Sequence, residues 1–145
     1  MSISCSTVHL VIPEADAERR PALASLETML ARLPETGFAE VWVMHGRFPA
    51  LCALLNGDRG WLTCLRAEGD AGFSSRNPGY AGPPDAELEF MLSTGQLDRY
   101  PAAWTYSRAE VLAAVRLFAE TRRCPEALSW FNDSGDGATS PDQGH

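Results

Sequence analysis

Residues 107–132, from Ser107 to Asn132, read SRAEVLAAVRLFAETRRCPEALSWFN and predict a helix, a turn and a strand. Ser107, followed by Glu110, predicts the start of a helix, because in a capping box each side chain satisfies the other residue's free backbone N–H group. The apolar side chains that follow recur at helical spacing and form one stripe: Val111, Leu112, Val115, Phe118 and Ala119. Pro125 ends the helix, because it has no N–H group and disfavours the α conformation at the residue before it.

A strand is predicted directly after this turn, over residues 127–131, because its aliphatic and aromatic side chains favour strands. A helix of about 15 residues is marginal on its own in water. It needs a sheet to cover its apolar stripe. The stretch therefore predicts a domain in which this helix packs on a sheet that the last strand joins.

The earlier chain supplies further strands and one more helix. Strands are predicted over residues 7–12, 38–44, 48–55, 61–65, 73–75 and 85–92. A first helix is predicted from Pro21 to Leu33, where leucines recur at spacings of three and four. The expected fold class is α+β, with a mostly antiparallel sheet of about five to seven strands and two packed helices in one domain over residues 1–132. Residues 133–145 are polar and rich in Gly and Ser, and we expect a disordered tail there.

The composition argues against several classes of function. The net charge is −7, which argues against binding to nucleic acid, and all 12 basic residues are arginine. A chain without lysine has no P-loop lysine and no Schiff-base lysine. No apolar run approaches the about 18 residues of a membrane span, and the N-terminus lacks the basic region of a secretory signal. We therefore expect a cytoplasmic protein with no membrane partner.

The cysteines form no CxxC pair. A hairpin is predicted around Asn56–Gly60, and a turn centred on Asp58 would bring Cys52 and Cys64 face to face. They could form a disulfide or a metal pair, or they could be two small side chains in the core. A reducing cytosol favours the second interpretation.

The end of the chain resembles the Imm type-one immunity proteins of bacterial polymorphic-toxin systems, whose sequences end in a helix, a proline and a strand with a tryptophan. The matching residues are Phe118, Thr121, Arg123, Pro125, Leu128 and Trp130. The resemblance covers roughly residues 8–132, and only this end is specific. It implies a protein that binds a cognate toxin domain in a one-to-one complex and blocks the toxin's active site. It also implies a toxin of the nucleic-acid deaminase class, because proteins of this family are often encoded beside such toxins.

Acidic side chains alternate with apolar ones over residues 85–92. Asp85, Glu87 and Glu89 would line one face of a strand, about 6.5–7 Å apart. Such a face is usually just solvated, but opposite a basic groove it would be a binding surface. Residues 68–84 are rich in Gly and Pro, which is typical of a binding loop, and Tyr80 in it would either contact a partner or cover the edge of the core. The candidate partner-binding residues are Asp85, Glu87, Glu89, Tyr80, Arg76 and Asp98.

No catalytic motif of the HExxH or GxSxG type occurs, and the three histidines are too scattered to predict a metal site. Cys124 could form a nucleophile pair with His9 or His45, but nothing in the sequence places them together. We therefore assign no catalytic, cofactor-binding or metal-binding residues. Two alternatives to an immunity protein stay open: a non-catalytic adaptor or subunit with another protein partner, and a small enzyme.

Overall fold

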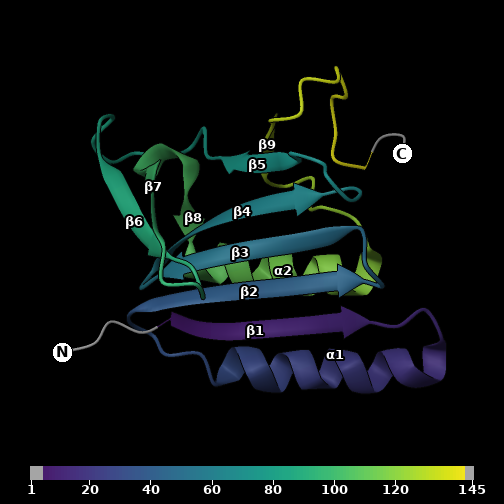
Figure 1. The fold of residues 1–145 in the computed structure, drawn as a ribbon. Coiled ribbons are helices and arrows are strands. Elements are labelled where there is room, and N and C mark those ends of the chain that lie inside the picture. Colours follow the sequence, from purple (N-terminus) through teal and green to yellow (C-terminus); the bar gives the residue numbers. More distant parts are fainter. Residues whose placement is uncertain (1–4, 143–145) are drawn as a thin grey trace.

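The computed structural model describes residues 5–142 (Figure 1). Its elements in chain order are β1 (Cys5–Ile12), α1 (Asp16–Ala31), β2 (Phe38–His45), β3 (Ala50–Asn56), β4 (Arg59–Leu65), β5 (Phe73–Arg76), β6 (Glu87–Met91), β7 (Leu97–Pro101), a 3-10 turn η1 (Ala102–Trp104), β8 (Tyr106–Ser107), α2 (Arg108–Thr121) and β9 (Ser129–Asn132). Within these residues β1-β2-β3-β4-β5-β9 form a seven-stranded sheet together with β8, which pairs with β4. Only β1 and β2 are parallel. The predicted α+β class is confirmed.

The α2 helix forms as its sequence predicts. The Ser107 side chain accepts a hydrogen bond from the Glu110 backbone N–H, and the Glu110 carboxylate completes the capping box. Arg122 closes the helix in the left-handed conformation, with φ of 66°, and its N–H donates to the Phe118 carbonyl. Val111, Val115 and Phe118 are fully buried against the sheet. Each such side chain contributes about 1.5–3 kcal/mol by leaving water.

Both helices pack on the same face of the large sheet, and Figure 1 shows α2 behind the sheet and α1 along β1. The core between them draws on alternate residues of β2 and β3, such as Val41, Val43 and Ala53. The first helix begins earlier than predicted, at Asp16, so that Pro21 lies inside it. The fixed φ of proline is helical, and the helix gives up one backbone hydrogen bond there.

The β3–β4 hairpin has a different register from the one predicted. Its turn is centred on Gly57 and Asp58, so that Asn56 pairs with Arg59, and Gly57 has the positive φ of 58° that glycine accepts most easily. Cys52 is therefore opposite Thr63 and not opposite Cys64. A slip of one residue reverses the face of every side chain, so the two cysteines point to opposite sides of the sheet.

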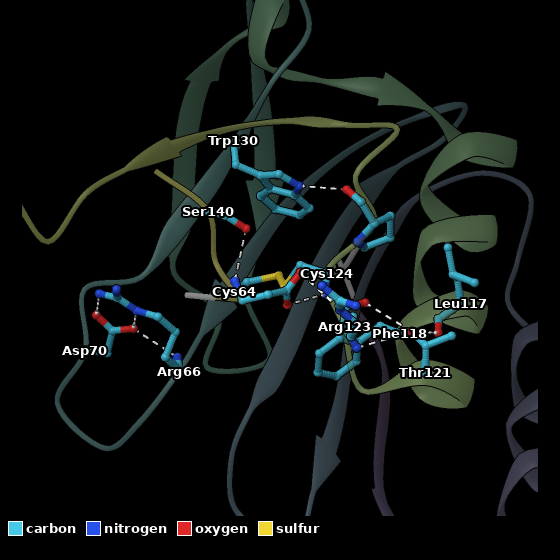
Figure 2. The surroundings of a disulfide bond; sticks show 12 residues. Cys64, Arg66, Asp70, Leu117, Phe118, Thr121, Arg123, Cys124, Trp130 and Ser140 are labelled. Atoms are coloured by element: carbon cyan, nitrogen blue, oxygen red, sulfur yellow. Dashed lines mark hydrogen bonds and ion pairs between the residues drawn. A yellow bond between two sulfur atoms is a disulfide. The ribbon is translucent and has the colours of Figure 1, made fainter. Parts of the chain in front are cut away.

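Cys64 instead forms a disulfide with Cys124, which follows α2 (Figure 2). The preference for reduced core thiols was therefore wrong for Cys64, while Cys52 stays a buried thiol. Spacing in the sequence could not reveal this bond. It joins two elements that meet only because α2 crosses the sheet and places its C-terminal end beside β4.

A second sheet, the β6–β7 hairpin, crosses one end of the large sheet on the face away from the helices (Figure 1). Phe90 is fully buried beneath it, and the Tyr100 ring stacks on Trp61 with centroids 4.3 Å apart. The tip of the hairpin is tied to β2 by the buried Glu40 carboxylate, which accepts a 2.7 Å hydrogen bond from the Ser93 backbone N–H. The sequence prediction missed β7, because its LDRYP sequence has no alternating apolar pattern.

Residues 133–142 lie in the described part of the chain, although a disordered tail was predicted over 133–145. Asp136 forms a 2.8 Å ion pair with Arg66, and the Asp142 carboxylate accepts a hydrogen bond from the Cys124 backbone N–H. These polar contacts hold the segment beside the disulfide without an apolar core of its own. Residues 143–145 lie outside the described residues.

Candidate partner-binding surface

Three of the predicted acidic residues lie on the outside of the β6–β7 hairpin. Glu87 and Glu89 are exposed, and Asp85 is exposed in the turn that precedes β6. Leu88 between them is partly buried and packs against the cluster of Cys52, Leu54 and Phe90. The predicted alternation is therefore confirmed at these positions.

The alternation fails at Met91, which was expected to share the face of Glu87 and Glu89 but is buried. The end of β6 runs against β1 there, and the Cys5 thiol donates a 3.2 Å hydrogen bond to the Met91 carbonyl. Burial at this end comes from contact with another strand, which the local pattern does not contain.

Arg99 on β7 lies directly opposite Glu89, with 3.7 Å between guanidinium and carboxylate. Both side chains are well exposed, so this pair adds little to stability. It does offset part of the negative charge of the hairpin. Beside it, a shallow hollow of about 480 Å³ lies between the hairpin and the ends of β2 and β3, and Glu87, Glu89 and Arg99 are among its lining residues.

Tyr80 lies beside the hairpin and is half-buried. Its hydroxyl donates to the Pro83 carbonyl at 3.1 Å, and the Arg59 guanidinium lies 6.0 Å from its ring centre. Tyr80 and Leu88 both line a second hollow, of about 510 Å³. Asp85, Glu87, Glu89 and Tyr80 therefore form one region, which we call the hairpin surface.

Arg76 and Asp98 do not belong to the hairpin surface. Arg76 ends β5 of the large sheet, and Asp98 is on β7 but shares the inner face of the hairpin with Phe90 and Tyr100. The Arg76 guanidinium is held between two rings, 3.6 Å from the Trp104 centroid and 4.7 Å from the Phe131 centroid, and it donates to the Ser74 hydroxyl. Burial lowers the pKa of Arg76, and the nearby Asp133 acts in the opposite direction.

Asp98 accepts hydrogen bonds from the Tyr100 hydroxyl at 3.2 Å and from the Gln96 amide at 2.6 Å. Burial, followed by the nearby Asp98 charge, raises the pKa of Tyr100 to about 12. Tyr100 therefore stays protonated and donates to Asp98. The six predicted residues split into four on the hairpin surface and two on the sheet side.

The sequence prediction missed the outer face of the large sheet, on which Arg76 lies. Cross-strand pairing puts His9, Trp42, Cys52, Thr63, Ser74 and Phe131 in one row across it. A second row contains Val11, Met44, Ala50 and Leu65. The sequence did indicate apolar side chains on both faces of the sheet, because residues 38–44 are apolar at odd and even positions alike.

The opposite end of the sheet carries the disulfide and a buried ion pair (Figure 2). Arg66 and Asp70 are each 5% exposed in their side chains and share two hydrogen bonds of 2.8 Å. The Arg66 guanidinium holds the pKa of Asp70 well below its usual range. Asp136 adds a second carboxylate to Arg66. This cluster fixes the loop after β4.

The Cys–His pair considered from the sequence does not form. The Cys124 sulfur is bonded to Cys64, and the buried His45 ring nitrogen lies 2.8 Å from the Phe118 carbonyl oxygen. His9 lies in the row on the other face of the sheet. Over residues 5–142, no three His, Cys, Asp or Glu side chains are grouped so that they could hold a metal ion. In the same residues, no helix has the length and apolar character needed to cross a membrane.

Neither protein-family models nor curated protein sequences give a match to this chain.

Proposed function

We propose that this protein is an immunity protein, which binds the toxin domain of a polymorphic-toxin system and occludes its active site in a one-to-one complex. The proposed toxin is a nucleic-acid deaminase. In this proposal the protein itself catalyses no reaction. The observation that carries it is the exposed acidic strand on the projecting β6–β7 hairpin, with Glu87 and Glu89 side by side. The C-terminal resemblance to the Imm type-one proteins supports it independently.

An enzyme that acts on nucleic acid needs basic side chains to hold phosphates. An acidic projection on a protein of net charge −7 is attracted to such a cleft, and opposite fields speed the encounter. A stable complex buries roughly 800 Å² on each partner, which is more than one short strand offers. Tyr80 and the two hollows beside the hairpin extend the contact area.

The residues of the C-terminal pattern have a structural role in this proposal. The Trp130 indole donates a 2.9 Å hydrogen bond to the Pro125 carbonyl, and Leu128 and Phe118 are part of the core. These contacts fix β9 to the end of α2. They leave the partner contacts to the hairpin surface.

The experiment is co-expression of the C-terminal domain encoded by the adjacent large gene, with and without this protein, followed by survival. A survival gain that depends on this protein supports immunity. An adaptor predicts no toxicity from the neighbouring gene. An enzyme predicts turnover by the purified protein, and with it a strongly shifted group in a deep pocket.

Binding kinetics then test the surface. The double change Glu87→Arg and Glu89→Arg should slow association with the toxin about tenfold and flatten its salt dependence. The matched control is Glu35→Arg with Glu120→Arg, two exposed positions away from the hairpin, which should keep more of the wild-type rate. Equal rates in the two double variants would remove the hairpin surface from the account, although not the function.

We place the protein in the cytoplasm, where a nucleic-acid-targeting toxin acts. The Cys64–Cys124 disulfide favours a second location, because disulfides persist in oxidising compartments and are rare in the cytosol. Acid quenching of cells followed by thiol labelling decides between the two. Free thiols at both positions support the cytoplasm, and a bond already formed in the cell supports an oxidising compartment.

A further inference from the structure

The outer face of the large sheet is covered by the β6–β7 hairpin at one end only (Figure 1). Beside and beyond the hairpin, apolar side chains from four strands reach the surface, and one of them, Trp42, packs against the cluster that contains Phe90 of the hairpin. Val11 is 47% exposed and Phe131 is 48% exposed, and Trp42, Met44 and Leu65 are partly exposed between them. We call these five residues, with the polar residues between them, the open face. Exposed apolar side chains gathered on one face and bordered by polar residues are typical of a protein interaction site.

Two carboxylates border the open face. Asp98 lies on the hairpin side, beside the Tyr100 hydroxyl, and Asp133 lies on the β5–β9 side, where it accepts a 2.6 Å hydrogen bond from the Ser74 hydroxyl. Both lie close enough to Tyr100 to raise the pKa of its hydroxyl, after the larger effect of burial. The cation beside them, Arg76, is already held between Trp104 and Phe131. The open face therefore combines aromatic rings with negative charge.

We propose that the open face binds a basic segment of the toxin, in which an arginine or lysine is flanked by apolar residues. This inference rests on the proposed function and adds a second contact surface to it. The cation lies beside the carboxylates of Asp98 and Asp133, where charge-assisted hydrogen bonds favour it. The flanking apolar side chains pack on Met44, Leu65 and Phe131.

The shape of the face favours a polypeptide over a small molecule. Small-molecule sites are concave and enclose most of their ligand. The row from His9 to Phe131 instead crosses six strands, which at about 4.8 Å between strands spans roughly 24 Å. Cys52 and Ser74 are buried within this row, so a chain segment that follows it contacts the exposed side chains beside them, from Val11 to Phe131.

The test uses the whole protein, labelled with ¹⁵N, and two probe peptides that differ only in charge: acetyl-Val-Arg-Leu-amide and the same peptide with citrulline in place of arginine. The arginine peptide should shift the Trp42 indole signal and the backbone signals of Thr63 and Ser74. The citrulline peptide should bind at least tenfold more weakly. Equal affinity of the two peptides, no shift at all, or shifts confined to the hairpin surface would each overturn the proposal.

A charge-neutral variant adds a second readout. Asp98→Asn with Asp133→Asn keeps hydrogen-bond acceptors for Tyr100 and Ser74 but removes both charges. This variant should bind the arginine peptide at least tenfold more weakly than the wild type does. The control Glu35→Gln with Glu120→Gln removes two exposed charges elsewhere and should bind as the wild type does. An equal loss in both variants would mean that net charge alone attracts the peptide.

The survival assay separates this inference from the function on which it rests. If the wild type rescues cells and Asp98→Asn with Asp133→Asn rescues them equally well at limiting expression, the open face is not the toxin contact and the function stands. If the wild type rescues no cells from the neighbouring gene product, the proposed function is wrong. The toxin is then also excluded as the partner that binds the open face.

Discussion

The Cys64–Cys124 bond should contribute a large share of the stability of this domain. The bond closes a loop with a sequence separation of 60 residues, and a loop of that length restricts the unfolded chain by about 4 kcal/mol at 25 °C. Both cysteines are buried, at 1% and 5% exposure, so the sulfurs also fill core volume. For a domain of this size 1 kcal/mol corresponds to about 2–4 °C in the melting temperature. Reduction should therefore lower the melting temperature by about 8–16 °C.

The assay is thermal unfolding of the wild type with and without a phosphine reductant, beside the double variant Cys64→Ala with Cys124→Ala. The variant should melt near the reduced wild type and should not respond to the reductant, because its remaining thiols, Cys5 and Cys52, are unpaired. A wild type that melts at the same temperature in both conditions would show that the bond does not stabilise the domain. So would a variant that loses as much on reduction as the wild type does.

Three further predictions concern buried groups. Glu40→Gln should cost about 1.5–3 kcal/mol of unfolding free energy in denaturant titrations, because charged hydrogen bonds to the hairpin tip are weakened. Burial alone would raise the pKa of Glu40, but its hydrogen bonds outweigh burial and lower the pKa. The stability that these bonds contribute is therefore present above about pH 4.3 and is lost as the pH falls. Between pH 7 and pH 3 the variant should lose less unfolding free energy than the wild type does. Arg66→Met should cost about 3–5 kcal/mol by leaving Asp70 buried without its cation, and adding Asp70→Leu should recover most of that loss, as calorimetry would show. Phe118→Ala should cost about 3–5 kcal/mol in the same denaturant titration, and a cost below 1 kcal/mol would contradict its place in the core.

Elements whose signals lie within the element were predicted well. The capping box at Ser107 and the alternation at Glu87 and Glu89 need only neighbours in sequence, and both occur as expected. The β3–β4 register was predicted one residue away from its actual position, because several turns fit the same Asn-Gly-Asp sequence. That single step changed the partner of Cys64.

The proposed binding surface was only half visible in the sequence. Charge alternation identified the hairpin surface, because the alternating residues are neighbours on one strand. The open face combines side chains from β1, β2, β4 and β9, and its two carboxylates belong to different loops and strands. Asp98 was selected for its charge and is found beside Tyr100, whereas Asp133 was assigned to a tail. Such a surface depends on strand order, which no single stretch of the chain contains.

Whether this protein neutralises a toxin is decided by the survival of cells that express the neighbouring gene's C-terminal domain together with either this protein or an empty vector. The account predicts that the domain kills cells with the empty vector and that this protein restores growth through a complex that can be isolated from the cells. Continued killing in the presence of folded, abundant protein would contradict it, and so would restored growth without any complex.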